Sequence, residues 1–179
     1  MTVLFHRYDH THAAELRELL LDVHDQCYAD SQSDFDTRER FADFLDGWSQ
    51  RPGWDCVVGY DADQAAGFAY GAPLAPGTPW WAKVTPRLAP DFTRESGDRT
   101  FAVSEVMVRP QWRKTGTAAQ IHEELLRARP EERATLFVNS DHAKVQALYE
   151  DWGYKTVGKS QPYPDSPLFT VMLRPLPHG

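Results

Sequence analysis

Two segments near the start of the chain have the spacing of amphipathic helices, with apolar residues three and four positions apart. These residues are Leu16, Leu19, Leu20 and Val23 in the first segment, and Phe41, Phe44, Leu45 and Trp48 in the second. Side chains at this spacing share one face of a helix, so both segments are predicted to be helical. Thr11 is the expected N-cap of the first helix, and Asp36 or Thr37 that of the second.

Short apolar runs bounded by turn-forming residues predict the strands. The runs are residues 3–5, 55–60, 65–72, 101–108, 133–138, 154–158 and 168–173, and the second and third form a hairpin. Further helices are predicted over residues 116–128 and around Val145, Leu148, Tyr149 and Trp152. Strands that alternate with helices in the second half predict an α/β sheet with some parallel pairing.

Residues 73–100 interrupt this pattern, because they contain five prolines and the adjacent pair Trp80 and Trp81. A connection of this length in a compact domain is usually either functional or disordered. Two adjacent tryptophans gain much by burial. We therefore expect an ordered excursion over one end of the sheet.

The composition is that of a globular domain: the chain has 179 residues, of which 41% are hydrophobic and 25% charged. No run approaches the ~18 apolar residues of a membrane span, and the first residues lack the pattern of a signal peptide. Cys27 and Cys56 are too few for a disulfide framework or a cysteine zinc site. We expect a cytoplasmic protein with two free thiols and no membrane association.

The formal net charge is −7, and all of it comes from the first 50 residues, which contain 11 acidic and 4 basic residues. A nucleic-acid-binding protein needs a basic surface to neutralise phosphates, so no nucleic-acid partner is expected. The acidic segment either attracts a cationic ligand or is only a solvated face.

The segment from Val108 to Ala118 runs from a predicted strand into a predicted helix and carries the clearest chemical signal. Amides at a helix start have no partner within the helix and lie at the positive end of its dipole. Gly116 lets the backbone approach a bulky anion, and Arg113 and Lys114 add positive charge. These features predict a diphosphate-binding loop, although an ordinary basic loop has a similar composition. The segment lacks the ending of a P-loop and the three glycines of a dinucleotide fingerprint.

This segment resembles the acetyl-CoA signature of the GNAT N-acetyltransferase superfamily, Arg/Gln-x-x-Gly-x-Gly/Ala after a strand that ends in Val-x-Pro. The matching residues are Val108, Pro110, Arg113, Gly116 and Ala118, and Lys114 stands where many members have Gly. A second resemblance follows in the expected order, with a strand-end Asn, a helix with Ala and Tyr, and a closing Gly-Tyr in residues 137–154. The resemblance is specific for residues 101–158, whereas residues 1–72 follow only the superfamily's order of elements.

The resemblance implies an α/β (α+β) fold with a mixed, mostly antiparallel central sheet of about six to seven strands, splayed central strands and about four flanking helices. It also implies a single acetyltransferase domain over residues 1–179, with residues 1–72 on the acceptor side and residues 101–158 as the acetyl-CoA-binding core. Within it, Trp80 and Trp81 either wall the acceptor site or pin the excursion to the sheet. A homodimer is possible, and the sequence does not decide the oligomeric state.

By position, the resemblance implies acetyl-CoA as the co-substrate and assigns its contacts. Strand backbone pairs with the pantetheine arm, loop amides bind the diphosphate, and an asparagine contacts the pantetheine region. These residues are Val106, Met107 and Val108 in the strand, Arg113, Lys114, Thr115, Gly116, Thr117 and Ala118 in the loop, and Asn139.

Two side chains are candidates for proton transfer. Tyr149 matches the tyrosine that often protonates the departing thiolate, although its place in an apolar stripe also suits a core aromatic. Glu105 is the candidate base for the acceptor amine, which has a pKa near ~10 when free, and a carboxylate in a structural hydrogen bond is the alternative. Strand alternation places Glu105 on the face of Val103 and Met107, and the Val108 amide is expected to hold the oxyanion.

These expectations describe an acetyl-CoA-dependent N-acetyltransferase that transfers acetyl directly to a primary amine of a small, cationic molecule, without an acyl-enzyme. A protein or peptide N-acetyltransferase and a non-catalytic acyl-CoA-binding sensor are the alternatives. No metal is expected, because no histidine has the ligand spacing or setting of a metal site; those considered are His6, His10, His12, His122 and His142.

Overall fold

The computed structural model of the chain describes residues 2–177. Its strands are β1 (Val3–Asp9), β2 (Asp55–Asp61), β3 (Gln64–Pro73), β4 (Thr100–Val108), β5 (Arg133–Asn139), β6 (Lys155–Ser160) and β7 (Phe169–Pro175). Its α-helices are α1 (Ala13–Cys27), α2 (Arg38–Ser49), α3 (Pro90–Thr93), α4 (Thr117–Leu126) and α5 (Ala143–Asp151). The four-residue α3 was not predicted, because it is too short to show a helical apolar spacing.

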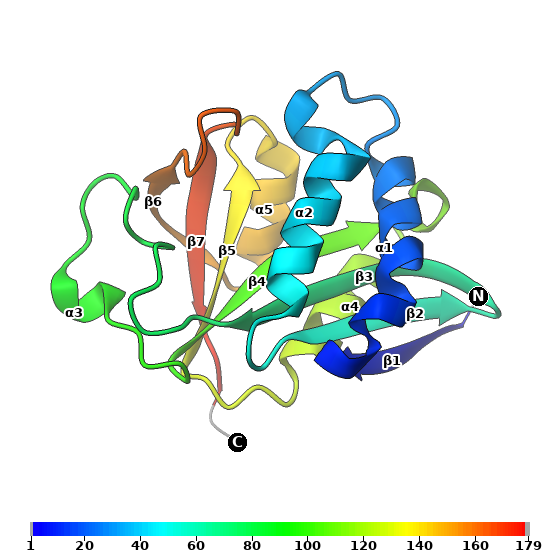
Figure 1. Cartoon of the computed structure of the whole chain (residues 1–179), viewed down its shortest axis with the longest axis horizontal. Coiled ribbons are helices and arrows are strands. Elements are labelled where there is room, and N and C mark those ends of the chain that lie inside the picture. Colours follow the sequence, from blue (N-terminus) through cyan, green and yellow to red (C-terminus); the bar gives the residue numbers. More distant parts are fainter. Residues whose placement is uncertain (1, 178–179) are drawn as a thin grey trace. The chain divides into compact units, whose positions relative to one another are not determined.

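The strands form a sheet in the order β1-β2-β3-β4-β5-β7-β6 (Figure 1). β1 and β3 each pair antiparallel with β2, and β5 and β6 each pair antiparallel with β7. β4 pairs with β5 in parallel. The predicted α/β fold with a mixed, mostly antiparallel sheet of about six to seven strands is confirmed.

The chain divides into two compact units. The first contains the residues up to 72 together with residues 103–128, and the second contains residues 73–102 and those from 129 onward. β4 and β5 pair over three residues, from Thr100 to Ala102 on β4, and all of them belong to the second unit. The rest of β4, from Val103, belongs to the first unit.

In the first unit, α1 and α2 bury apolar faces as their spacing predicts. The buried residues include Leu16, Leu20 and Val23 of α1 and Phe41, Leu45 and Trp48 of α2. Figure 1 shows α1 and α2 in front of β2 and β3, and α4 behind them. Phe41 packs on Phe68 of β3 with ring centroids 6.4 Å apart. On the other face, Ile121 of α4 lies against Gly59 of β2. The strands of this unit therefore have an apolar layer on both faces.

The two expected helix starts have different outcomes. The Thr37 side chain accepts a hydrogen bond from the Arg40 amide at 3.2 Å, so the predicted cap of α2 is confirmed. The prediction for Thr11 is wrong, because Thr11 lies inside a short 3₁₀ turn that is itself capped by Asp9. The Asp9 carboxylate accepts the Thr11 amide at 2.9 Å, and α1 begins only after this turn.

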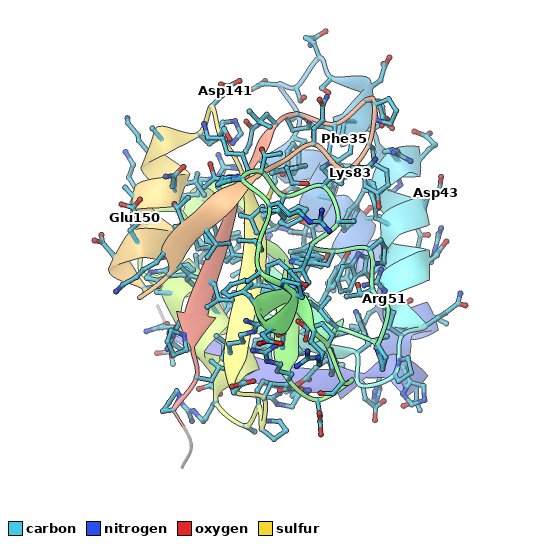
Figure 2. The ribbon with its side chains drawn as sticks, turned by 90° about the vertical axis from the view of Figure 1, so that its left-hand side faces the viewer. Phe35, Asp43, Arg51, Lys83, Asp141 and Glu150 are labelled. Atoms are coloured by element: carbon cyan, nitrogen blue, oxygen red, sulfur yellow. The ribbon has the colours of Figure 1, made fainter. Side chains whose placement is uncertain are left out.

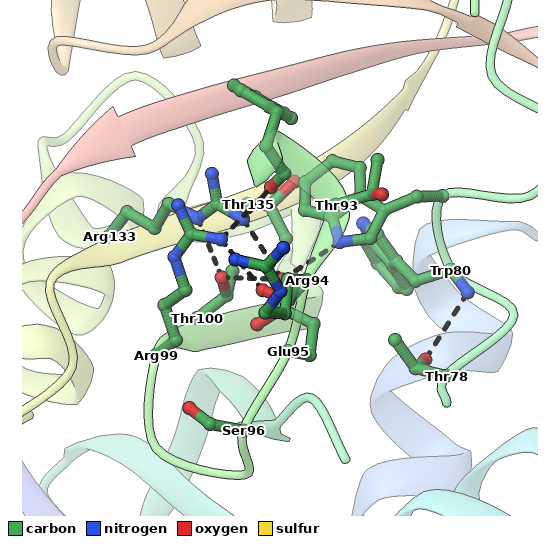
Figure 3. Close-up of polar contacts among 12 residues, drawn as sticks. Thr78, Trp80, Thr93, Arg94, Glu95, Ser96, Arg99, Thr100, Arg133 and Thr135 are labelled. Carbon is green, nitrogen blue, oxygen red and sulfur yellow. Dashed lines mark hydrogen bonds and ion pairs between the residues drawn. The ribbon is translucent and has the colours of Figure 1, made fainter. Parts of the chain in front are cut away.

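The proline-rich connection of the second unit is held by a buried ion pair (Figure 3). Oε2 of Glu95 accepts hydrogen bonds from Trp81 Nε1 at 2.9 Å, from Thr100 Oγ1 at 2.9 Å and from Arg133 Nη2 at 3.0 Å. The Arg133 guanidinium also lies over the rings of Trp81 and Phe92, 5.3 and 4.6 Å from their centroids. A buried charge pair with this many hydrogen bonds is costly to break, since either charge alone would stay buried without a partner.

The two adjacent tryptophans therefore have a structural part in this unit. Trp81 is 6% exposed and donates a hydrogen bond to Glu95. Of the two alternatives for Trp81, this contact supports the one in which it pins the connection to the sheet. Trp80 packs on Phe137 of β5 with ring centroids 4.2 Å apart. Both contacts tie the connection to its own unit.

Gly67 lies where the backbones of β3 and β4 come close together in the first unit. A Cβ atom at this position would lie 2.3 Å from the Met107 carbonyl oxygen and 2.9 Å from the Val108 Cα atom. We expect Gly67→Ala to lower the free energy of unfolding in urea by about 1–3 kcal/mol, because backbone atoms must move to admit the methyl group. Gly47→Ala in α2 is the control, since nothing lies within 4 Å of its Cβ position. It should stabilise the helix by up to about 1 kcal/mol, and equal effects of the two substitutions would contradict the close approach.

Candidate functional site

The loop before α4 has the backbone geometry of an anion-binding helix start. Gly116 is the N-cap of α4 with a φ of +82°, and no side chain caps the helix. Residues 113–116 are exposed. The first amides of α4 are therefore left for solvent or a ligand, at the positive end of the helix dipole. Lys114 also has a positive φ of 60°, a conformation in which Gly is the least strained residue.

The segment that leads into this loop is fixed to the first unit at several points. The Arg109 amide donates to the Ala66 carbonyl at 2.8 Å. The buried Trp112 donates through Nε1 to Asp61 at 3.0 Å. The loop therefore stands on a rigid base, which keeps its exposed amides in place.

Cys27, at the end of α1, belongs to the same region. Its Sγ donates to the Val108 carbonyl at 3.3 Å, and its carbonyl accepts from Arg113 Nη2 at 3.5 Å. Burial raises the pKa of the Cys27 thiol, and the Arg113 guanidinium opposes that shift. The sequence analysis did not connect Cys27 with the site, because nothing in a sequence shows a contact between residues 81 positions apart.

Glu105 lies on β4, three residues before the strand ends at Val108 and the loop to α4 begins. It is half-buried, and in the part of the chain that the structure describes neither a cation nor a hydrogen-bond donor contacts its carboxylate. Burial raises the pKa of Glu105 to about 8, and the negative charge of Asp36 adds to the shift. A carboxyl group with such a pKa can take up and release a proton near neutral pH, as a general base must. Among the described residues no donor makes the structural hydrogen bond of the alternative interpretation.

The other strand residues assigned to the coenzyme lie close to Glu105 in the chain. Val106, Met107 and Val108 follow it on β4, beyond the three residues that pair with β5. Met107 and Val108 are buried, and Val106 is half-buried. The structure thus places these residues, Glu105 and the loop from Arg113 to Ala118 in one compact unit.

Asn139 and Tyr149 belong to the second unit. Asn139 is the last residue of β5, and its Oδ1 accepts the Asp141 amide at 2.9 Å, which forms the turn into α5. Tyr149 lies on α5 with its ring edge-on to Trp152 and Tyr154, at centroid distances of 5.2 and 5.9 Å. No residue of α5 is buried, so the interpretation of Tyr149 as a core aromatic on an inward stripe is wrong. Its role as a proton donor stays a prediction.

The histidines considered as metal ligands are found in buried, half-buried and exposed settings. His122 is fully buried in α4, whereas His142 is exposed at the start of α5. His6 packs edge-on to Tyr60, and His12 lies 3.2 Å from Asp9. Within residues 2–177 no three His, Cys, Asp or Glu side chains are grouped to hold a metal ion. Over the same residues, no helix has the length and apolar character needed to cross a membrane.

Known proteins share this architecture. Residues 93–172, from the end of α3 to β7, match the family model of the acetyltransferase (GNAT) domain. No curated protein sequence matches the chain.

Solved structures are similar over nearly the whole chain. An acetyltransferase from Thermus thermophilus superposes with a TM-score of 0.63 at 15% identity, covering 98% of both chains. The ribosomal-protein-S18-alanine N-acetyltransferase of Escherichia coli has a TM-score of 0.62 at 14% identity, covering 99% of this chain and 96% of its own. PaiA N-acetyltransferase from Thermoplasma acidophilum, in complex with coenzyme A, has a TM-score of 0.58 at 9% identity, covering 98% and 99%.

At these identities the superpositions establish the fold, and the family model adds the domain type for residues 93–172. The matched segment contains the loop from Arg113 to Ala118, called the glycine loop below, together with Glu105 and Tyr149. Residues 93–172 are thus similar to the GNAT acetyltransferase domain, and the chain shares its fold with solved acetyltransferases.

Proposed function

We propose that the chain transfers acetyl from acetyl-CoA directly to a primary amine of a small, cationic molecule. The observation that carries this proposal is Glu105, a half-buried carboxylate with no partner among the described residues, on the strand that leads into the glycine loop. A charge taken out of water without compensation is costly. Such a group is therefore suited to meet a charge that arrives with the substrate, and an ammonium group supplies one.

The residues present fit the coenzyme. The uncapped start of α4, the exposed backbone of residues 113–116, and the charges of Arg113 and Lys114 suit a diphosphate. Acetyl-CoA would supply the thioester that is cleaved. The backbone of Val106, Met107 and Val108 would contact the pantetheine arm, and Asn139 would lie near it, as the resemblance implies.

In the proposed reaction Glu105 takes a proton from the acceptor ammonium, directly or through water. The amine nitrogen then forms a bond to the thioester carbonyl carbon, and the Val108 amide donates a hydrogen bond to the oxyanion. The carbon–sulfur bond breaks as Tyr149 gives a proton to the departing thiolate. The second proton of the amine nitrogen leaves to water, and Tyr149 regains its own proton from water, so that one proton in all remains on Glu105 and is released to solvent. Both substrates are bound together, so no acyl-enzyme is needed.

The acidic residues near the chain start support a cationic acceptor. Arg38 pairs with Glu18, Asp22 and Asp25, and Arg17 pairs with Asp46. These two arginines neutralise only part of the 11 acidic charges in the first 50 residues. Asp43, for example, projects from the exposed side of α2 (Figure 2). The remaining negative charge would raise the local concentration of a cation.

The test is a screen for acetyl-CoA turnover, read as release of free thiol, against polyamines, aminoglycosides, amino acids and peptides. We expect turnover with small cationic amines, and a KM for these amines that rises with salt while coenzyme affinity changes less. Turnover confined to peptides would favour the protein N-acetyltransferase alternative, which the Escherichia coli structure represents in this fold. Tight coenzyme binding without turnover on any acceptor would favour the sensor alternative. A salt-independent KM would leave the acidic segment without a role in capture.

A further inference from the structure

The two edge strands of the sheet, β6 and β1, differ in how well they are protected against pairing with another chain. An edge strand has unpaired backbone N–H and C=O groups, and proteins usually shield it with lysines, an irregular register or a covering segment. β6 has all three: Lys155 and Lys159 are exposed, the register shifts between Thr156 and Gly158, and Thr85 of the proline-rich connection bridges Lys159. The Thr85 amide donates to the Lys159 carbonyl at 2.8 Å, and the Lys159 amide donates to the Thr85 carbonyl at 2.9 Å. The free side of β6 is therefore shielded.

β1 shows none of these three features in the part of the chain that the structure describes. Its seven residues contain no lysine, glycine or proline, and they pair with β2 in an unbroken register. The guanidinium of Arg7 is turned onto its own unit, where it donates to the Asp55 carboxylate and to the Glu124 carbonyl. Among the described strands, β2 is the one that pairs with β1. The other side of β1 is thus a regular seven-residue edge that can accept a further strand.

Leu4 on this edge is 62% exposed, more than any other large hydrophobic residue among residues 2–177. It shares a face of the sheet with His6 and Tyr8, because alternate residues of a strand point to the same side. The His6 ring is edge-on to Tyr60 of β2 with centroids 5.3 Å apart, and the Tyr8 and Tyr60 hydroxyl groups are 3.3 Å apart. A single exposed leucine is common on protein surfaces, but this one lies beside half-buried tyrosines at an edge that another strand can extend. A strand added to β1 would cover Leu4.

The opposite face of β1 borders a groove of about 350 Å³ between this strand and α4. Its lining residues are Phe5 of β1 together with Ala119, Gln120, Glu123, Glu124 and Arg127. Phe5 is half-buried, so part of its ring is still open to solvent. A side chain from a strand next to β1 would enter the groove and cover this part of Phe5. Both faces of the edge therefore gain apolar contacts from a neighbouring strand.

We infer that β1 pairs antiparallel with β1 of a second copy, so that two copies form a dimer with one continuous sheet. Residues opposite each other in such a pair lie on the same face of the sheet. With the two-fold axis at His6 all seven residues are paired: Val3 lies opposite Asp9 of the partner, Leu4 opposite Tyr8, and Phe5 opposite Arg7. The exposed Leu4 then packs on the partner's Tyr8 ring, and the stem of the partner's Arg7 covers Phe5.

The charges on β1 favour this register. Arg7 and Asp9 lie opposite uncharged residues, whereas an axis at Arg7 would place two arginines opposite each other, which destabilises a strand pair. The strand is therefore complementary to itself, which favours a second copy as the occupant. A two-fold contact of this kind uses the same surface on both copies and closes at two.

The dimer does not depend on the proposed acetyl transfer. None of the residues assigned to that reaction lies on β1 or lines the groove beside it. Dimerisation and turnover can therefore be lost separately, and each is measured by its own experiment.

Sedimentation velocity of the full chain tests the dimer. We expect the wild type to be dimeric at micromolar concentrations and to dissociate on dilution. Leu4→Lys should raise the dissociation constant at least about 10-fold, because both Leu4–Tyr8 contacts are lost and lysine disfavours pairing at a sheet edge. Leu168→Lys, at a residue 46% exposed in the other unit, is the control and should leave the constant unchanged. A wild type that stays monomeric up to its solubility limit, or a dimer that Leu4→Lys leaves intact, would overturn the inference.

Disulfide cross-linking tests the register, and it does so even if Leu4→Lys fails to fold. His6 lies opposite the partner's His6 with Cα atoms about 4.5–5.5 Å apart, a separation that a disulfide can bridge. Leu4 and the partner's Leu4 are displaced by about 13 Å along the strands, which is too far. His6→Cys should therefore give a covalent dimer on oxidation, and Leu4→Cys, on the same face of the strand, should not.

The wild type supplies the background of this experiment, because it contains the buried Cys56 and the half-buried Cys27. A failure of His6→Cys to cross-link above this background, or equal cross-linking of Leu4→Cys, would overturn the proposed pairing of β1.

Discussion

Glu105→Gln is expected to lower kcat/KM by about 10²–10⁴-fold, the usual contribution of a general base. The amide is nearly isosteric with the carboxyl group but cannot take the proton of the acceptor ammonium. Acetyl-CoA should bind to the variant with wild-type affinity, because its proposed contacts are backbone groups and the loop cations. Isothermal titration and initial rates separate the two effects. Glu39→Gln, an exposed substitution on α2, is the control.

The pH dependence follows from the raised pKa of Glu105, about 8 in the folded chain. The base is active when ionised, so kcat/KM of the wild type should increase with pH and level off above about 8. Burial of the carboxyl group is the main cause of this value, and the negative charge of Asp36 raises it further. A rate that is flat across this range, or a Glu105→Gln enzyme with an unchanged profile, would remove Glu105 as the base.

The same substitution should increase stability at high pH. The pKa of Glu105 is about 4.5 when unfolded and higher when folded, so the folded chain binds more protons between these values. The wild type therefore loses stability as the pH rises from about 4.5 to about 8, while the glutamine variant does not. With about 1.4 kcal/mol per pKa unit, and some relief by solvent, the variant should be on the order of 2–4 kcal/mol more stable at pH 9 and nearly equal to the wild type at pH 4. Equal stability of the wild type and the variant at pH 9 would show that the folded chain stabilises the charged Glu105 carboxylate with a cation, a hydrogen-bond donor or water.

The elements that the sequence predicted well are those with local signals. The apolar spacing of α1 and α2 predicted their buried faces, and the glycine loop was placed at a helix start because Gly116 and the preceding Val108 and Pro110 lie within a few residues. β1 was predicted too short, because beyond Phe5 its residues are polar. It is at the edge of the sheet, where only β2 pairs with it and much of its surface faces solvent.

What the sequence could not predict depends on contacts between distant segments. Cys27 reaches Val108 only after α1 has packed against β4. Asp36 was considered only as a helix cap, because nothing in the sequence shows that its charge raises the pKa of Glu105. The apolar spacing of α5 was misleading in another way: it predicted the helix, but Val145 and Leu148 are 39% and 41% exposed.

Tyr149→Phe is expected to lower kcat by about 10²-fold at neutral pH, because the thiolate then leaves without a proton donor. The ring contacts with Trp152 and Tyr154 do not depend on the hydroxyl, so stability and coenzyme affinity should change little. Tyr163→Phe, at a residue 42% exposed, is the control. An unchanged kcat, or a loss of coenzyme affinity in place of rate, would contradict the role of proton donor.

The defect of Tyr149→Phe should also shrink as the pH rises. A free thiol has a pKa of about 8.5, so above that value a thiolate is a stable product and needs no proton as the carbon–sulfur bond breaks. The ratio of wild-type to variant kcat should therefore decrease between about pH 7 and about pH 9.5. The defect of Glu105→Gln should stay constant up to about pH 8 and shrink above it, because the wild type levels off there while the free amine, which needs no base, becomes more abundant up to its pKa of about 10. A ratio for Tyr149→Phe that does not change with pH would contradict the role of proton donor.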